Sequence, residues 1–213
     1  MPYKVMERLR EFYGEKKQKV SEDPVRFLII TIISQNTSDK NSRRAFSKFE
    51  ERFKSWDEVL SSPPEEIARV IKEGGLPFVK AKRIKEALSE IKRRCSFDLS
   101  FLKDMDVEEG RRWLLSIPGV GEKTASCVLL FSFGKPAMPV DTHVYRVSKR
   151  LGLIPKNTPV NKAGRILEKI VPPDKIYEFH LNLIEHGRRI CRAKNPLCGG
   201  CFLKELCDEG RDS

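Results

Sequence analysis

Long apolar stretches are missing from this sequence. The longest apolar runs, 27–33 and 128–133, are far shorter than the roughly 20 residues that a membrane-spanning helix needs. The first ten residues contain three basic side chains but no apolar segment of the kind found in secretory signals. We therefore expect a protein without a membrane segment that resides in the cytoplasm.

Acidic residues are in deficit, with Asp+Glu 30 against Lys+Arg 41 and a net charge of +11 at pH 7. Such a charge favours a polyanionic partner such as nucleic acid, although a basic surface also serves solubility alone. The hydrophobic fraction of 39% is too high for a disordered chain. A length of 213 residues suits one large domain or two small ones.

Alternating strand patterns, Gly/Ser linkers and repeats are also absent, whereas apolar residues recur at helical spacing along nearly the whole chain. The sequence thus predicts an all-α protein. The opening pattern indicates an amphipathic helix over 3–19, and the apolar segment 25–34 indicates a buried helix. Asp141 precedes a pattern over 142–151, where an isolated Asp most often caps a helix.

Four of the six cysteines lie close together, separated by six, two and five residues: Cys191, Cys198, Cys201 and Cys207. In a reducing cytoplasm, clustered cysteines are more often metal ligands than disulfides. Their chemistry permits either tetrahedral zinc or an iron–sulfur cluster, because both accept four thiolates. Two disulfides or unrelated cysteines form the remaining alternative.

A tight turn is predicted between two helices at Pro118, Gly119, Val120 and Gly121. Backbone N–H groups at the start of the following helix attract a phosphate, although an ordinary corner between two helices has the same residues. Lys123 falls in the first turn of that apolar helix, so we expect its amine to be partly buried at the rim of the core. Such a lysine can act as a nucleophile, whereas a surface lysine that touches DNA phosphate is commoner.

Three motifs in this order resemble the helix-hairpin-helix DNA glycosylases of the endonuclease III group. They read I-P-G-V-G-E-K-T-A at 117–125, V-D-T-H-V at 140–144 and C-x6-C-x2-C-x5-C at 191–207. The resemblance extends from about residue 23 to residue 207. It implies a two-lobed all-α fold with a DNA cleft between the lobes. One lobe spans 21–134, and the other combines 1–20 with 135–213, including an iron–sulfur loop over 186–213.

The resemblance also implies roles for individual residues. Lys123 would be the catalytic nucleophile and Asp141 an essential catalytic carboxylate, while the turn at Pro118, Gly119, Val120 and Gly121 would grip the DNA backbone. Gln35 resembles the family residue that fills the gap left by a flipped nucleotide, and Leu76 resembles the residue that wedges into the opposite strand. The following residues would hold a 4Fe–4S cluster: Cys191, Cys198, Cys201 and Cys207.

The function implied is that of a bifunctional DNA glycosylase/AP lyase in base excision repair. It would remove damaged, in our expectation oxidised, pyrimidines and nick the abasic site by β-elimination through a lysine imine. We expect a monomer that acts on double-stranded DNA containing a damaged base or abasic site, at the nucleoid of a prokaryotic cell. Asn36 and Pro77 depart from the family pattern, so a T:G or U:G mismatch glycosylase is an alternative. A non-catalytic DNA-binding module with structural zinc is another.

Overall fold

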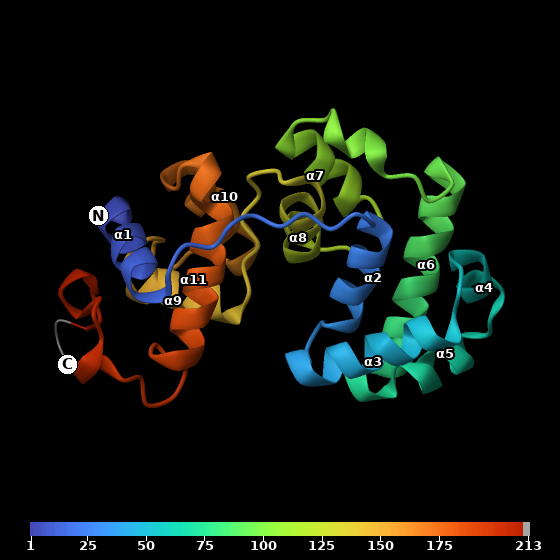
Figure 1. The fold of residues 1–213 in the computed structure, drawn as a ribbon, viewed down its shortest axis with the longest axis horizontal. Coiled ribbons are helices and arrows are strands. Elements are labelled where there is room, and N and C mark those ends of the chain that lie inside the picture. Colours follow the sequence, from blue (N-terminus) through green and yellow to red (C-terminus); the bar gives the residue numbers. More distant parts are fainter. Residues whose placement is uncertain (211–213) are drawn as a thin grey trace. The chain divides into compact units, whose positions relative to one another are not determined.

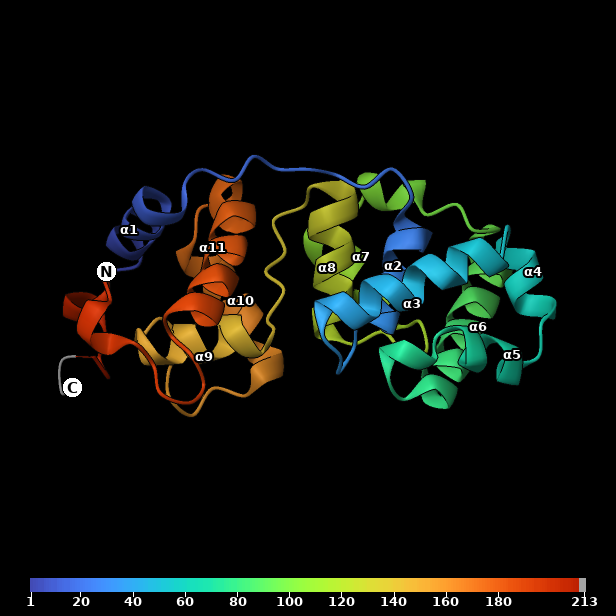
Figure 2. The ribbon, with the colours of Figure 1, turned by 60° about the horizontal axis from the view of Figure 1, so that its bottom comes forward.

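The computed structural model describes residues 1–210. In this range every regular element is helical and no strand occurs, which confirms the predicted all-α fold. The chain divides into two compact units. The central unit is Ser21–Phe133, and the terminal unit combines Met1–Val20 with the chain from Gly134 onward. Each can be traced in Figures 1 and 2 by the colours that follow the residue number. Among the described residues no helix is both long and apolar enough to cross a membrane.

A nearly all-apolar helix, α2, forms the core of the central unit. Leu28, Ile29 and Ile32 have no exposed surface. Helix α2 packs against α3 (Asp39–Arg52), α6 (Pro77–Cys95) and α8 (Glu122–Phe133). The Asp23 side chain caps its start by accepting the backbone N–H of Arg26 at 2.8 Å. The α-helices of this unit are α2 Pro24–Ile33, α3 Asp39–Arg52, α4 Trp56–Ser61, α5 Pro64–Val70, α6 Pro77–Cys95, α7 Val107–Leu115 and α8 Glu122–Phe133, with short 3-10 helices η1 Lys72–Gly74 and η2 Ser100–Lys103.

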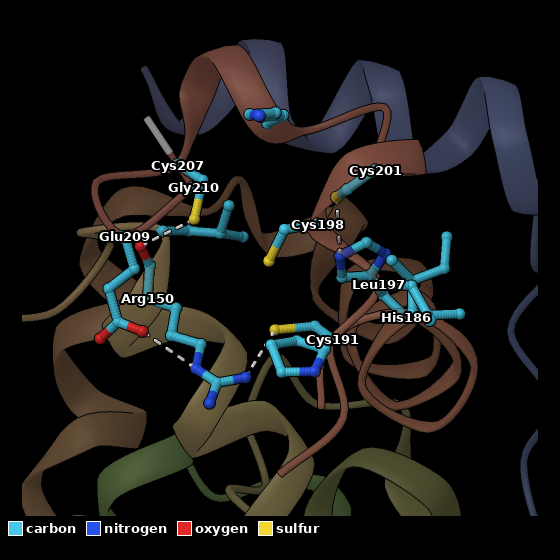
Figure 3. A pocket seen from close by; sticks show the side chains of 13 residues that line it. Arg150, His186, Cys191, Leu197, Cys198, Cys201, Cys207, Glu209 and Gly210 are labelled. Carbon is cyan, nitrogen blue, oxygen red and sulfur yellow. Dashed lines mark hydrogen bonds and ion pairs between the residues drawn. The ribbon is translucent and has the colours of Figure 1, made fainter. Parts of the chain in front are cut away.

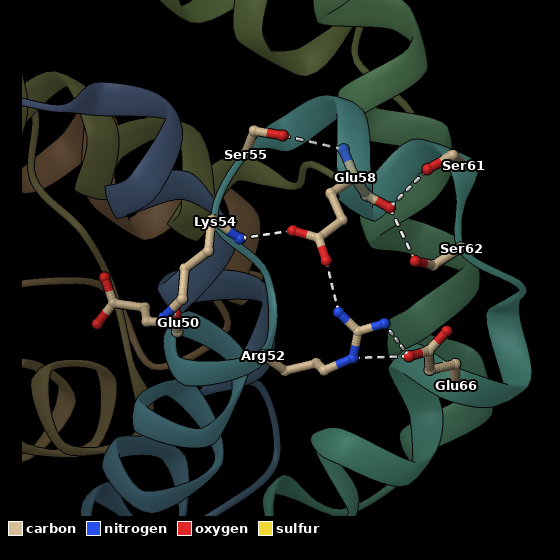
Figure 4. Close-up of polar contacts among 8 residues, drawn as sticks. All are labelled: Glu50, Arg52, Lys54, Ser55, Glu58, Ser61, Ser62 and Glu66. Carbon is tan, nitrogen blue, oxygen red and sulfur yellow. Dashed lines mark hydrogen bonds and ion pairs between the residues drawn. The ribbon is translucent and has the colours of Figure 1, made fainter.

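One guanidinium joins three consecutive helices of this unit, as Figure 4 shows. Arg52, at the end of α3, donates to Glu58 of α4 at 2.5 Å and to Glu66 of α5 at 2.7 Å. Glu58 also accepts the backbone N–H of Lys54 at 2.8 Å. The network thus links the end of α3 to α4 and α5, and both of these helices pack against α6.

In the terminal unit the first helix lies beside the last one, as both ribbon views show (Figures 1 and 2). The Tyr13 hydroxyl of α1 (Pro2–Tyr13) lies 3.1 Å from Nδ1 of His186 in α11 (Ile176–Arg189), and burial raises the pKa of Tyr13 to about 12. Helix α11 also packs against α9. The helices are α1 Pro2–Tyr13, α9 Thr142–Arg150, α10 Val160–Ile170 and α11 Ile176–Arg189, with short 3-10 helices η3 Pro173–Lys175, η4 Cys198–Gly200 and η5 Lys204–Leu206.

The opening helix is shorter than predicted. It ends at Tyr13 and does not continue to Lys19, because Gly14 adopts a left-handed φ of 77° and donates its backbone N–H to Arg10. A glycine takes this conformation without the steric cost of a Cβ atom, and helices commonly end at such a residue. The polar segment that follows has no apolar face to bury, so burial does not favour a continuation of the helix beyond the glycine.

Candidate functional site

The predicted turn before α8 is a tight connection in the central unit. Ile117 and Val120 are buried and anchor it, and the Val120 backbone N–H donates to Ile117 O at 3.2 Å. The other residues of the turn, Pro118, Gly119 and Gly121, are exposed, and Gly119 has a φ of 78°. The first N–H groups of a helix lack acceptors within that helix. The exposed turn at the start of α8 therefore has the chemistry to bind an anion.

Lys123 occupies the first turn of α8 and is exposed. The expectation of a partly buried amine was therefore wrong. The neighbouring residues Thr124 and Ala125 are 3% and 0% exposed, so the core begins one position later along the helix. The structure thus presents the lysine at the surface, on a helix start that is itself held rigidly by buried neighbours.

Gln35 contacts the same helix start. It follows the last turn of α2, and its Nε2 lies 3.4 Å from the Thr124 hydroxyl. On its other side, Oε1 accepts a hydrogen bond from Arg83 of α6 at 2.7 Å. A Cβ atom on Gly119 would lie only 3.1 Å from the Arg83 side-chain stem. Arg83 thus brings Gln35 and the turn together within one unit.

Sequence reasoning did not identify Arg83. It stands in a basic stretch with Lys80, Lys82 and Lys85, and nothing local distinguishes it from these neighbours. Its importance comes from its hydrogen-bond partner Gln35, which lies 48 residues away in the chain.

Leu76 forms the residue before α6, and its side chain is 54% exposed. Its backbone is left-handed, with φ 49° and ψ 47°. Asn36, directly after Gln35, is also left-handed, with φ 52°. Asn tolerates this conformation, whereas a Leu in it is uncommon and is a mark of functional sites.

Asp141 caps α9 in the terminal unit, as predicted for an isolated Asp. Its Oδ1 accepts the backbone N–H of Val144 at 2.7 Å, and the residue is half-buried. The cap uses one of two carboxylate oxygens, so capping does not compete with a chemical role. Lys123 and Asp141 belong to different units, and each is positioned by its own helix start.

The four clustered cysteines line a single cavity of about 100 Å³ in the terminal unit, shown in Figure 3. None of them forms a disulfide. The loop is closed by backbone bonds on both sides: Leu197 donates to Ile190 O at 3.0 Å, and Cys201 donates to Cys198 O at 3.2 Å. Tertiary structure therefore brings all four thiols to one place.

Two basic side chains approach the sulfur atoms (Figure 3). Arg150 Nη1 lies 3.5 Å from Cys191 Sγ, and His186 Nε2 lies 3.8 Å from Cys201 Sγ. Arg150 is held in place by Glu209 at 3.0 Å. N–H groups next to thiolate sulfurs stabilise the negative charge of an iron–sulfur cluster. The donor set and the cavity fit such a cluster, although burial raises the pKa of the Cys201 and Cys207 thiols and binding must displace their protons.

Two family models match the chain. The model described as HhH-GPD superfamily base excision DNA repair protein covers residues 29–173, and the model described as the iron–sulfur binding domain of endonuclease III covers residues 191–207. The chain is 41% identical over 186 residues to endonuclease III of Thermotoga maritima, which corresponds to 87% of this chain and 83% of that protein. It is 34% identical to endonuclease III of Bacillus subtilis, over 90% and 84% of the two chains.

Solved structures of similar proteins have the same fold. A trapped covalent intermediate of endonuclease III with DNA superposes with a TM-score of 0.86 at 29% identity and covers 100% of this chain and 98% of that one. A thermostable thymine-DNA glycosylase superposes with a TM-score of 0.83 at 26% identity, over 100% and 97% of the two chains.

Proposed function

The chain belongs to the HhH-GPD superfamily of base excision DNA repair proteins, and on that premise we propose that it removes oxidised pyrimidines from DNA through the amine of Lys123. It is a DNA glycosylase with AP lyase activity of the endonuclease III type, and its partner is DNA. It carries a 4Fe–4S cluster. The residues that perform these tasks and the preferred lesion are the subject of the proposal.

One observation carries the assignment of Lys123. The lysine is exposed directly beside Thr124, which contacts Gln35, and both follow the exposed turn that suits a phosphate. A nucleotide whose phosphate binds this turn, and whose vacated place in the duplex is filled by Gln35, would present its sugar close to Lys123. The base must first leave the stack, because C1′ is otherwise inaccessible.

The chemistry follows from a primary amine. The Lys123 nitrogen lone pair forms a bond to C1′ of the deoxyribose, and the bond from C1′ to the base breaks, so that the base leaves with the electron pair and takes up a proton. The nitrogen then loses its protons, the C1′–O4′ bond breaks with its electron pair and a proton going to O4′, and the sugar ring opens to an imine. Loss of a proton from C2′ then expels the 3′ phosphate by β-elimination, and water hydrolyses the imine. Excision and strand nicking thus use the same nitrogen atom.

Asp141 is proposed to assist this reaction with its carboxylate. A negative charge there stabilises positive charge that develops on the sugar as the base leaves, and it can also accept a proton from the attacking amine. Its Oδ1 remains the cap of α9, which fixes the side chain in one orientation. Leu76 is proposed to enter the opposite strand, where its exposed apolar side chain would replace stacking contacts.

The cluster is proposed to be held by the cysteines that line the cavity: Cys191, Cys198, Cys201 and Cys207. When bound, it would supply iron–sulfur bonds that fold the loop. The loop follows the exposed Arg188 and carries the exposed side chains Arg192 and Lys194, which suit contacts to DNA phosphates. We further propose a monomer that works on the nucleoid in the cytoplasm of a prokaryotic cell.

Borohydride trapping tests the assignment of Lys123. Reduction of the imine during turnover should give a covalent adduct of wild-type protein with DNA that contains thymine glycol. Lys123→Gln should lose the adduct and the nick but retain lesion binding. The control Lys92→Gln, which removes an exposed lysine elsewhere in the central unit, should keep both. An undiminished adduct in Lys123→Gln would refute the role of this lysine.

A mismatch glycosylase is the second candidate, favoured by the similarity to a thymine-DNA glycosylase and by Asn36. Single-turnover excision rates on thymine glycol duplexes and on T:G duplexes distinguish the two candidate functions. We expect the oxidised pyrimidine to be removed faster. Faster removal from T:G would replace the proposed substrate with a mismatched base.

A further inference from the structure

Lys80 is a buried lysine to which the proposed reaction gives no role. Its side chain in α6 is 1% exposed. The ammonium group donates two hydrogen bonds, to Ile33 O at 2.7 Å and to Gly74 O at 2.6 Å. Burial, and to a lesser extent the charge of Arg83, lowers the pKa of Lys80 to about 8. Burying an amine is costly, so its position calls for a specific explanation.

The two carbonyl acceptors precede the two residues proposed to enter the duplex. Ile33 is the last residue of α2 and lies two positions before Gln35, while Gly74 ends η1 and lies two positions before Leu76. The two segments run close together, since a Cβ added to Gly74 would lie 3.4 Å from Ile33 O. Lys80 therefore ties together two chain segments directly before their DNA-facing residues.

Both segments then adopt a left-handed conformation, at Asn36 with φ 52° and at Leu76 with φ 49°. Such a backbone persists only where the surroundings hold it in place. The two hydrogen bonds from Lys80 to the preceding carbonyls, which we call a bracket, supply this restraint.

The turn held in this way displays an apolar tip. Within the central unit, three large hydrophobic side chains are exposed. Leu76 belongs to this turn, and Phe78 and Val79 follow it in the first turn of α6. Inserting apolar side chains between base steps requires the bases to unstack, which costs a few kcal/mol per step. On a flexible loop, these side chains would be pushed aside before the bases unstack.

We propose that Lys80 is a positioning residue that locks the Gln35 end of α2 to the Gly75–Leu76 turn, so that Gln35 and Leu76 enter the duplex as one rigid element. This inference rests on the proposed function of the two residues. Lys80 itself contacts neither DNA nor the reacting atoms. It acts on the extrusion of the nucleotide and leaves the subsequent chemistry unchanged.

The chain contains a matched control on the same helix. Lys85 of α6 also donates two hydrogen bonds to backbone carbonyls, to Leu60 O at 2.7 Å and to Ser62 O. Leu60 lies in the last turn of α4, and Ser62, which Figure 4 shows, follows it in the connection to α5. No residue proposed to bind DNA lies in α4 or in that connection. Lys80→Met and Lys85→Met therefore remove the same kind of bracket from two different places.

The experiment compares these variants on two duplexes with full-length, cluster-loaded protein. In the first, thymine glycol is fully paired with adenine; in the second, the same lesion is flanked by mismatched pairs, so that extrusion requires little unstacking. Single-turnover excision is measured on both. In a parallel set of the same duplexes, 2-aminopurine replaces the base opposite the lesion and reports by its fluorescence whether the bases have unstacked.

For Lys80→Met we expect excision from the paired duplex to slow by ~10- to 100-fold, since two buried hydrogen bonds are lost, with the fluorescence rise lost as well. On the mismatched duplex its rate should stay within about 3-fold of wild type, as should both rates of Lys85→Met. If Lys80→Met does not fold by circular dichroism, Lys80→Gln, which retains an N–H donor, replaces it, with a smaller loss expected on the paired duplex alone.

The inference is overturned if the Lys80 variant behaves like Lys85→Met, or if it is slowed equally on both duplexes. These outcomes presuppose an active wild type. A wild-type protein that neither excises the lesion nor forms the borohydride adduct would instead refute the proposed function.

Discussion

Arg83 of α6 donates a hydrogen bond of 2.7 Å to the side-chain oxygen of Gln35, which follows α2 in the central unit. The bond fixes which way the amide points, because Nε2 then faces the Thr124 hydroxyl. The Arg83 stem also packs against Gly119 of the exposed turn. Gln35 is proposed to fill the gap that the flipped nucleotide leaves in the duplex, and its orientation thus depends on the Arg83 side chain of α6.

Replacing Arg83 should therefore impair excision. In Arg83→Met the stem contact to Gly119 is retained but the hydrogen bond to Gln35 is lost, so we expect single-turnover excision from thymine glycol duplexes to slow by ~10-fold or more. Arg93→Met is the control, because Arg93 is exposed on the same helix and pairs with Glu90. Equal rates for the two variants would show that the bond to Gln35 has no role in catalysis.

Gly119 should tolerate no side chain. Its φ of 78° disfavours any L residue, and a Cβ would lie 3.1 Å from Arg83. We expect Gly119→Ala to lower the free energy of unfolding by about 2–3 kcal/mol and to weaken DNA binding. Gly14→Ala separates the two causes, since Gly14 has a φ of 77° with nothing within 4 Å of the added Cβ. Urea unfolding measures the stability of both variants. At Gly14, where φ 77° and ψ 169° are nearly confined to glycine, we expect a loss of about 1–3 kcal/mol with DNA binding unchanged.

Asp141→Asn should separate capping from chemistry. Asn caps helices about as well as Asp, so the free energy of unfolding should change by less than about 0.5 kcal/mol. Turnover should fall by ~100-fold or more, because the negative charge is gone. Asp23 provides the matched control: it caps α2 with the same geometry, at 2.8 Å from the Arg26 N–H, and Asp23→Asn should retain full turnover. Normal single-turnover rates in Asp141→Asn would leave this residue as a cap only.

The buried Lys80 should make stability depend on pH. Its pKa of about 8 in the folded protein lies below the ordinary value of 10.5, so unfolding takes up a proton between these values. The free energy of unfolding should therefore rise with pH from about 8 to 10.5, by up to about 1.4 kcal/mol per pH unit. Urea unfolding across this window should show the rise in wild type relative to Lys80→Met. Parallel curves for the two proteins would mean that Lys80 titrates normally.

Metal content should identify the cysteine cavity as the cluster site. Protein prepared without oxygen should contain about four irons and four acid-labile sulfides per chain, as a 4Fe–4S cluster requires. Cys198→Ser should lower both in elemental and sulfide analysis, whereas Cys95→Ser should not, since Cys95 lies in the central unit with its thiol 3.2 Å from Ile91 O. One zinc and no sulfide would contradict the cluster.

The local sequence by itself determined where most helices begin and end. Asp23 with Pro24, and Asp141, are caps whose side chains act within three residues, and Gly134 ends α8 with a φ of 67°. Such signals are readable because their partners are neighbours in the chain. The same holds for the cysteine spacing and for the turn before α8. Gly14 shows the limit of periodicity, since a single left-handed residue ended a helix that the pattern extended further.

Only the tertiary structure decided which distant residues meet. Gln35 contacts Thr124 across 89 positions, and Lys80 reaches Ile33 across 47. The periodicity of α6 places Lys80 on the buried face with Ile84 and Leu88, but it does not reveal which distant carbonyls accept hydrogen bonds from the amine. Burial and hydrogen bonding of a long side chain depend on the helices packed around it, and that packing is a property of the whole unit. The exposure of Lys123 was decided in the same way, by how closely its neighbours on α8 pack into the core.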